Sequence, residues 1–309
     1  MVKVVFFGTP DFAVPTLERL LVSTQVLAVV TQPDRPAGRG GKLTAPPIKQ
    51  LALAQGLPVY QPERLRKAET VLLALENLDA DFFVVVAYGQ ILSPRVLAMP
   101  RLGCINVHGS LLPHYRGAAP VQWAVFHGET TTGITTMLMD AGLDTGPMLL
   151  KTTLPIPTTA TSADLLQELA PLGADLLITT LTTFASLTPI PQDPSQSSYA
   201  PLITPQHLVI PWDAPATVIH NRVRAFYPQV YTQHRAQRLK ILQTQPVDQP
   251  SLSPWGTVTQ LVKFQGFQVS TGAGQLLVTQ VQPAGKKSQS AWDYSNGSRL
   301  QVGEQLGLL

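Results

Sequence analysis

Cysteine is almost absent from this sequence. Cys104 is the single cysteine among 309 residues, so no disulfide can form within the chain, and a reducing compartment fits this composition. It lies in the apolar run Leu102–Ile105, where a small core residue is far commoner than a nucleophile. The six histidines are scattered, and neither a Cys/His cluster nor an H-E-x-x-H pattern occurs. We therefore predict no disulfide and no metal site.

Signals for export and membrane insertion are also lacking. The chain starts Met1-Val2-Lys3 and runs directly into an apolar segment, without a basic n-region or a small-residue cleavage site. No apolar stretch approaches the roughly 20 residues that a membrane-spanning helix needs. No coiled-coil pattern or long amphipathic seam is present either. We expect a cytoplasmic protein with no membrane partner, and a monomer.

Charged residues are few, at 13% against 44% hydrophobic residues, which is typical of a globular chain. Their distribution is uneven. Residues 1–205 carry 13 Lys+Arg and 15 Asp+Glu, which gives a net charge of −2. Residues 206–309 carry 9 Lys+Arg and 4 Asp+Glu, which gives a net charge of +5. A basic back third suggests a polyanionic partner, although a solvated surface with few acids explains the charge equally well.

The front part alternates buried strands with helical patterns. Apolar strand-like runs cover residues 2–7, 26–30, 81–87 and 104–107, and helical patterns between them include residues 68–78. Thr9-Pro10-Asp11 looks like a capped helix start. Nearly all-apolar strands indicate a parallel sheet covered on both faces, hence a doubly wound α/β domain. Ligands bind beyond the carboxyl ends of such strands, so we expect the active site near residues 8–10, 88–90 and 106–109.

The back part has a different pattern. Residues 187–205 are rich in Pro, Ser and Gln and indicate an extended linker. A short helix candidate at residues 218–225 follows, and then short β-like runs at residues 240–242, 256–258, 267–270 and 275–278. A small β-barrel is the natural closure for such strands. We predict domains at residues 1–186 and 206–309, joined by the linker.

Two nucleotide and nucleophile motifs are missing. The first strand ends Gly8-Thr9-Pro10-Asp11, which is not G-x-G-x-x-G, so a dinucleotide cofactor is disfavoured. Ser110 does not lie in G-x-S-x-G, and no other nucleophilic serine motif stands out. We therefore expect any group transfer to be direct, without a covalent enzyme intermediate.

Asn106 and His108 alternate along a strand end, so both side chains point to one side. An amide can donate a hydrogen bond to a developing oxyanion, and an imidazole can donate as well or pass a proton near neutral pH. A lone histidine would more often be a core residue with a backbone partner. The neighbouring Asn106 and the Gly and Pro of the following turn favour a role in acyl transfer.

Asp144 lies in the glycine-rich loop 139–147 between two apolar runs. Its carboxylate could polarise His108 or accept a proton through water. A β-turn between two strands is the simpler interpretation of such a loop. Sequence spacing alone does not show that Asp144 reaches His108.

Residues 34–43 contain three cations, three glycines and a proline between a strand and a helix. Such a segment is expected to be an exposed and mobile loop. Flexible basic segments can order on a phosphate backbone, but a plain solvated loop is common for this composition.

Taken together, these segments resemble the methionyl-tRNA formyltransferase family over nearly the whole chain. The resemblance is carried by residues 7–12, TQPDRPAGRG at 31–40, VVVAYG at 84–89, MPRLGCINVHGSLLPHYRGAAP at 99–120, MDAGLDTG at 139–146 and residues 276–287. The most specific part surrounds residues 110–113. Related folate-dependent formyltransferases share the Asn, His and Asp positions but usually lack the loop at 31–40. The departures from the family pattern are Gly41, Leu202 and Tyr227-Pro228-Gln229, and none touches these positions.

The resemblance implies a Rossmann-like formyltransferase domain, a linker and an OB-like barrel. It implies that Asn106, His108 and Asp144 are catalytic, and that 10-formyltetrahydrofolate is the formyl donor and initiator methionyl-tRNA the acceptor. The donor site would include Ser110, Leu111, Leu112 and Pro113, with Tyr88, Gly89 and Gln90 lining the pterin pocket. The residues Arg35, Arg39 and Lys42 would contact the tRNA acceptor stem, and the basic barrel would lie against the tRNA backbone, with salt-sensitive binding.

Two alternatives remain open from the sequence. One is a formyltransferase acting on a small amine such as a nucleotide sugar or glycinamide ribonucleotide, which would need neither the loop of residues 35–42 nor a basic barrel. The other is a non-catalytic RNA-binding protein that keeps the fold, against which the intact Asn106, His108 and Asp144 argue.

Overall fold

The structure is a computed structural model that describes residues 1–37, 41–250 and 253–307. The chain forms two compact units. The first combines residues 1–120, 131–155 and 166–200, and the second combines residues 121–130, 156–165 and 201–309. Each unit is thus assembled from several stretches of chain.

The first unit is built on a seven-stranded sheet with the strand order β10-β9-β7-β6-β1-β2-β5. Five neighbouring strands, from β5 to β7, are parallel, and β9 and β10 are antiparallel. The predicted doubly wound sheet is confirmed, with two antiparallel strands added at one edge. The strands are β1 (Lys3–Gly8), β2 (Gln25–Val30), β5 (Val59–Tyr60), β6 (Phe82–Val86), β7 (Gly103–His108), β9 (Thr131–Leu138) and β10 (Met148–Pro155).

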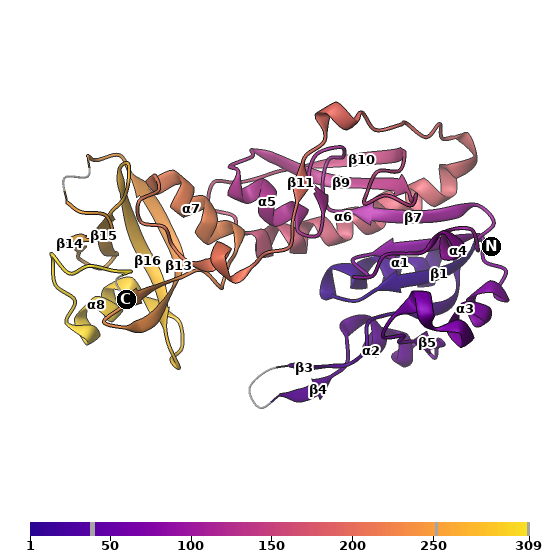
Figure 1. The fold of residues 1–309 in the computed structure, drawn as a ribbon, viewed down its shortest axis with the longest axis horizontal. Coiled ribbons are helices and arrows are strands. Elements are labelled where there is room, and N and C mark those ends of the chain that lie inside the picture. Colours follow the sequence, from indigo (N-terminus) through magenta and orange to yellow (C-terminus); the bar gives the residue numbers. More distant parts are fainter. Residues whose placement is uncertain (38–40, 251–252, 308–309) are drawn as a thin grey trace. The chain divides into compact units, whose positions relative to one another are not determined.

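Helices cover both faces of this sheet, which is why its central strands are apolar on both sides (Figure 1). On one face, α3 (Glu69–Glu76) and α4 (Pro94–Leu97) share a core with β1 and β6. On the other face lie α1 (Val14–Ser23), α2 (Pro47–Ala54) and α6 (Ser162–Thr183). Each fully buried Leu or Phe contributes about 1.5–3 kcal/mol of hydrophobic stabilisation.

The helix α6 is the one helix among the described residues that is long and apolar enough, by length and composition, to cross a membrane. Its Leu169 and Leu177 are fully buried, Gly173 approaches Val107 of β7, and Thr180 shares a hydrogen bond of 2.8 Å with Thr136 of β9. These contacts are those of a core helix packed on the sheet.

The carboxyl ends of β1 and β6 meet at the point where the strand order reverses, the usual ligand position in such sheets. The prediction that Thr9 caps the first helix is wrong. A 3₁₀ turn at Asp11–Ala13 precedes α1, whose N-cap is Ala13. The Thr9 hydroxyl instead donates to the carbonyl oxygen of Tyr88 at 3.0 Å and so ties the two strand ends together.

Part of the predicted linker is hydrogen-bonded along the first unit. The strand β11 (Tyr199–Ala200) pairs in parallel with β8 (Arg116–Gly117), and Ile190 exchanges backbone hydrogen bonds with Met148. Residues 187–200 therefore belong to the packed structure of this unit. The boundaries at residues 186 and 206 stay predictions about independently folding domains.

Residues 35–44 form an antiparallel hairpin of β3 (Arg35–Ala37) and β4 (Lys42–Thr44), which projects from the sheet beside α2 (Figure 1). The prediction of a mobile loop is therefore wrong for these two ends, which pair regularly. Residues 38–40 at the tip lie outside the described residues.

The second unit contains a six-stranded sheet with the order β12-β13-β16-β15-β14 and with β17 on β16. The predicted set of short strands is confirmed, and all their pairings are antiparallel. Within the described part of the unit, β12 and β14 stand at the two ends of the sheet. The elements are β12 (Tyr231–His234), β13 (Gln237–Val247), β14 (Val258–Val262), β15 (Gly266–Ser270), β16 (Gln275–Pro283), β17 (Gln289–Ser290), α7 (Ala216–Ala225) and α8 (Ala291–Ser298).

Aromatic side chains join the earlier stretches of chain to the second unit. Trp123, from α5 (Pro120–Phe126), makes edge contacts with Phe126 and Phe226, and its indole N–H donates to the Pro201 carbonyl at 2.8 Å. All four tryptophans of the chain fall in this unit. Tryptophan fluorescence therefore reports the unfolding of the second unit specifically.

A hydrogen-bonded network around Glu304 holds the end of the second unit. His234 bonds Tyr294 through Nδ1 at 2.5 Å and Glu304 through Nε2 at 2.9 Å, and the Arg235 guanidinium also pairs with Glu304. Burial raises the pKa of Glu304, but hydrogen bonds from Arg235, His234 and the Gln301 N–H more than offset this and lower it to about 2. The ionised carboxylate is therefore the form that stabilises the fold.

We expect Glu304→Gln to lower the free energy of unfolding of the second unit by about 2 kcal/mol at pH 7, because charged hydrogen bonds are lost. Since the folded pKa lies below the unfolded value, this contribution is present above about pH 4.5 and is lost as pH falls towards 2. Urea unfolding followed by tryptophan fluorescence between pH 3 and 7 measures it. A wild-type-to-variant difference that does not shrink at low pH would contradict this account.

Candidate active site

Three donors or potential donors converge on the Asp144 carboxylate, whose side chain is only 12% exposed. Asn106 Nδ2 donates to Oδ1 at 3.2 Å, and the Gly117 backbone N–H donates to Oδ2 at 2.9 Å. His108 Nδ1 lies 3.7 Å from Oδ2. The three residues that the sequence predicts to be catalytic are therefore brought together in space.

The backbone of the Asp144 loop is held in an uncommon conformation. Asp144 has a φ of +53°, in the left-handed region that Asp tolerates better than most residues. Its donor Gly117 has a φ of +118°, and a Cβ there would stand 2.7 Å from the Ala200 carbonyl oxygen. Only glycine fits at this donor position, so its N–H reaches the carboxylate without a steric clash.

His108 is buried, and its two ring nitrogens face different partners. Nε2 lies 2.9 Å from the Tyr115 carbonyl oxygen, which can only accept a hydrogen bond. The neutral ring therefore carries its proton on Nε2, and Nδ1, next to Asp144, is its unprotonated nitrogen. When both nitrogens are protonated, the positive ring pairs with the carboxylate.

The carbonyl that fixes His108 comes from a strained residue. Tyr115 has a φ of +59°, which is rare for a bulky side chain and costs about 1–3 kcal/mol. Its N–H donates to the Ser198 hydroxyl at 2.9 Å. Strain of this kind persists only where the surroundings enforce it, and here it directs the carbonyl to the imidazole.

Asn106 retains hydrogen-bonding capacity beyond Asp144. Its amide orientation is fixed because a carboxylate accepts and only the NH₂ group can donate. The bond to Asp144 uses one of the two N–H bonds of Nδ2. The second is the donor that could meet an oxyanion.

The segment Ser110–Pro113 is a rigid turn after β7. The Ser110 hydroxyl donates to the His114 carbonyl at 2.6 Å, and Leu112 and Pro113 are buried while Leu111 is half-buried. Thr135 of β9 bonds both the Ser110 carbonyl and the Leu112 N–H. The Lys151 ammonium donates to the Leu112 carbonyl at 2.5 Å, and its partial desolvation lowers the pKa of Lys151. The role of the segment Ser110–Pro113 in donor binding stays a prediction, and Leu111 is the most accessible side chain of this segment.

In the segment Tyr88–Gln90, the side chains of Tyr88 and Gln90 make contacts that stabilise the fold. Tyr88 is 2% exposed within the core, and burial raises the pKa of its hydroxyl. Gln90 accepts from the Leu65 N–H at 2.8 Å and donates to the Pro62 carbonyl at 3.0 Å. Gly89 has a φ of +87°, which favours glycine, and lies beside the Gln32 amide. A ligand at this loop would therefore meet mainly backbone, and the predicted role in the pterin pocket stays a prediction.

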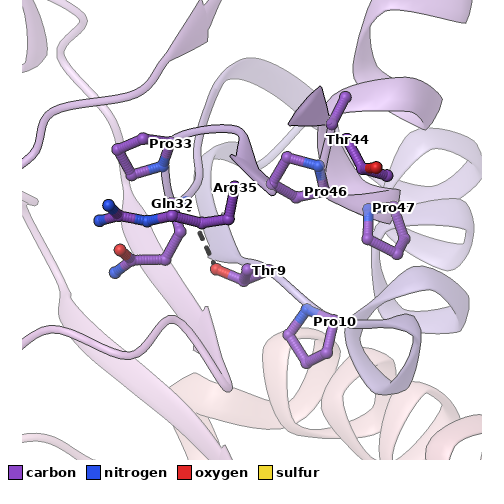
Figure 2. A pocket seen from close by; sticks show the side chains of 9 residues that line it. Thr9, Pro10, Gln32, Pro33, Arg35, Thr44, Pro46 and Pro47 are labelled. Atoms are coloured by element: carbon purple, nitrogen blue, oxygen red, sulfur yellow. Dashed lines mark hydrogen bonds between the residues drawn. The ribbon is translucent and has the colours of Figure 1, made fainter. Parts of the chain in front are cut away.

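A pocket of about 380 Å³ opens at the base of the β3–β4 hairpin. Figure 2 shows prolines on both sides of it and the Arg35 side chain across it. Thr9 and Gln32 form its polar floor and are joined by a hydrogen bond from the Gln32 N–H. Its lining is Thr9, Pro10, Gln32, Pro33, Arg35, Thr44, Ala45, Pro46 and Pro47.

The hairpin is anchored through Asp34. The carboxylate accepts from Gln61 at 2.7 Å and from Lys49 at 2.8 Å, and these two bonds lower the pKa of Asp34, with Gln61 as the largest cause. The predicted contact residues Arg35 and Lys42 are exposed on the paired strands. Arg35 makes an exposed ion pair with Glu63. The third, Arg39, lies outside the described residues.

No role was predicted for Gly117, Tyr115 or Gln192, which hold the predicted catalytic side chains through hydrogen bonds to or from backbone groups. Tyr115 and Gly117 lie within the stretch 99–120 that carries the resemblance, which was their one signal, whereas no motif surrounds Gln192. The structural description contains no group of three or more His, Cys, Asp or Glu residues that could hold a metal.

Comparison with known proteins agrees with this arrangement. The family model described as formyl transferase matches residues 2–181, and the model described as formyl transferase, C-terminal domain, matches residues 202–299. The chain is 52% identical to a methionyl-tRNA formyltransferase of Cyanothece sp., over 99% of both chains. It is 51% identical to one of Synechocystis sp., over 98% of this chain and 99% of that protein.

Solved structures show the same fold at lower identity. A sugar 3N-formyl transferase, WlaRD, aligns with a TM-score of 0.67 at 20% identity, over 93% of this chain and 99% of that one. HypX from Aquifex aeolicus in complex with tetrahydrofolic acid aligns with a TM-score of 0.63 at 14% identity, over 99% of this chain and 48% of that one. With its two matched domains and its full-length relatives, the chain belongs to the methionyl-tRNA formyltransferase family.

Proposed function

We propose that this protein transfers the formyl group of 10-formyltetrahydrofolate to the α-amino group of methionine on initiator methionyl-tRNA. The observation that carries the proposal is the convergence of Asn106 and His108 on Asp144 in a chain about half identical to full-length relatives of that name. It acts in the cytoplasm as a monomer, and the reaction requires no metal.

In this mechanism, the neutral methionyl amine attacks the formyl carbon and forms a C–N bond. The carbonyl oxygen becomes an oxyanion, which the second N–H of Asn106 stabilises. Collapse of the tetrahedral intermediate breaks the bond between the formyl carbon and N10, and a proton moves from the attacking nitrogen to N10. Oxyanion donors of this kind are worth about 3–4 kcal/mol of barrier.

His108 and Asp144 move the proton and supply charge. Because Nε2 is bonded to the Tyr115 carbonyl, the Nδ1 side of the ring takes part, next to Asp144 Oδ2. The protonated ring adds positive charge near the oxyanion, and the carboxylate keeps that charge compensated before and after transfer. Asp144 exchanges the proton through water at its exposed edge.

The formyl donor would lie against residues 110–113 and the backbone of residues 88–90, where the carboxyl ends of β6 and β7 meet. The acceptor end of the tRNA would approach from the β3–β4 hairpin. Arg35, on the wall of the pocket in Figure 2, is well placed to meet a phosphate or a base near the reacting amine. Its surface ion pair with Glu63 is worth about 0–1 kcal/mol, so it exchanges partners easily.

The second unit suits a polyanionic partner. Glu304 pairs with His234 and Arg235 in this unit. The exposed cations of this unit include Arg238, Lys263, Lys286, Lys287 and Arg299. Neither these cations nor the hairpin is needed by a formyltransferase of small amines.

The direct test is transfer of labelled formyl from 10-formyltetrahydrofolate to methionyl-tRNA. We expect labelling of the initiator tRNA and little labelling of the elongator methionyl-tRNA. Absence of labelling on both, with tetrahydrofolate still bound, would reject the tRNA substrate and leave a small amine as acceptor.

We expect Asn106→Ala to lower kcat by about 10²–10³-fold with little change in KM for the folate, because an oxyanion donor acts mainly in the transition state. Single-turnover transfer measures the chemical step, and circular dichroism checks the fold. Asn77→Ala, at an exposed position after α3, is the matched control. A near-normal rate for Asn106→Ala would remove this residue from the chemistry.

We also expect Arg35→Ala and Lys42→Ala each to weaken binding of methionyl-tRNA and to reduce the slope of log K against log salt by about 1, since each removes one phosphate contact. Arg19→Ala is the control, because Arg19 is an equally exposed cation on α1 paired with Asp175. An unchanged salt slope in both hairpin variants would exclude the hairpin from the tRNA interface.

A further inference from the structure

We infer that Gln192 is a positioning residue for the formyl transfer, acting on Asp144 and on its donor Gly117 through backbone contacts. The inference rests on the function proposed above. Gln192 is 8% exposed and lies in the Pro- and Ser-rich stretch predicted as a linker. Nothing in its sequence surroundings marks it as part of a catalytic site.

Every polar group of the Gln192 amide faces the catalytic loops. Nε2 donates to the carbonyl oxygens of Asp144 at 2.8 Å and of Gly146 at 2.7 Å. Oε1 accepts from Arg116 Nε at 2.9 Å. An amide is the one side chain that can donate twice and accept at the same end.

These bonds fix both sides of the Asp144 carboxylate. The bonds to Asp144 and Gly146 clamp the loop in which Asp144 adopts its φ of +53°. The bond to Arg116 holds the residue just before Gly117, whose N–H donates to the same carboxylate. Loss of Gln192 would therefore free the carboxylate and its donor together.

The same stretch of chain also positions His108. The Ser198 hydroxyl accepts from the Tyr115 N–H, and the Ser198 carbonyl accepts from the Arg116 N–H at 2.9 Å. Tyr115 in turn presents its carbonyl to His108 Nε2. Residues 192–200 thus form a strap that bonds the supports of both Asp144 and His108.

Two substitutions of Gln192 distinguish the hydrogen bonds that its amide donates from the packing of its side chain. Gln192→Glu keeps the size and the acceptor for Arg116 but cannot donate, so its carboxylate would face two carbonyl oxygens. Gln192→Ala removes all three bonds. Gln196→Glu and Gln196→Ala are the controls, because Gln196 is exposed in the same strap and its side-chain amide donates to Asp193.

The experiment is formyl transfer to methionyl-tRNA under single-turnover conditions from pH 5 to 9, with the active fraction determined by burst titration. We expect both Gln192 variants to lose about 10–100-fold in rate per active site, with KM for both substrates within about twofold. The pH–rate profile should shift, since the spacing between Asp144 and His108 changes. The Gln196 variants should match the wild type.

Two results would overturn the inference. One is a wild-type rate and pH profile in both Gln192 variants. The other is a reduced active fraction whose remaining molecules keep the wild-type rate and pH profile, which would make Gln192 purely structural. An inactive wild-type protein would instead reject the proposed function itself.

Discussion

The Asp144 carboxylate is nearly buried, and a buried charge is tolerated only where hydrogen-bond donors replace water. Asn106 and the Gly117 N–H supply them here, and His108 stands ready to supply a third. The left-handed backbone of Asp144 and Tyr115 and the strap of residues 192–200 follow from this requirement. The backbone strain at Asp144 and Tyr115 is offset by the hydrogen bonds that hold their loops in place.

The sheet places these groups where they can act on a substrate. Asn106 and His108 end a parallel strand next to the point where the strand order reverses, and Thr9 and Gln32 tie the neighbouring strand ends to Tyr88. The antiparallel pair β9 and β10 delivers Asp144 from the other side. A rigid scaffold thus carries the chemistry, while the exposed hairpin and the basic second unit are free to meet a large anionic partner.

Much of this was predictable from local pattern. The apolar run of β6 and the alternation of Asn106 with His108 predict a buried strand and a shared face, and both are present. The approach of Asp144 to His108 was beyond prediction, because it depends on how two strands pair far apart in the chain. Thr9 resembled a helix cap but bonds across the sheet. Gln192 was missed because the Pro- and Ser-rich composition around it suggested a linker, and its partners are backbone atoms.

The central claim is that the Tyr115 carbonyl fixes the His108 tautomer, so that the neutral ring carries its proton on Nε2 and presents an unprotonated Nδ1 to Asp144. Nitrogen-15 NMR of the histidine ring, with His108 assigned by substitution, measures this directly. The account predicts that, in the neutral ring, Nε2 has the chemical shift of a protonated nitrogen and Nδ1 that of an unprotonated nitrogen. A neutral ring protonated on Nδ1 would contradict it.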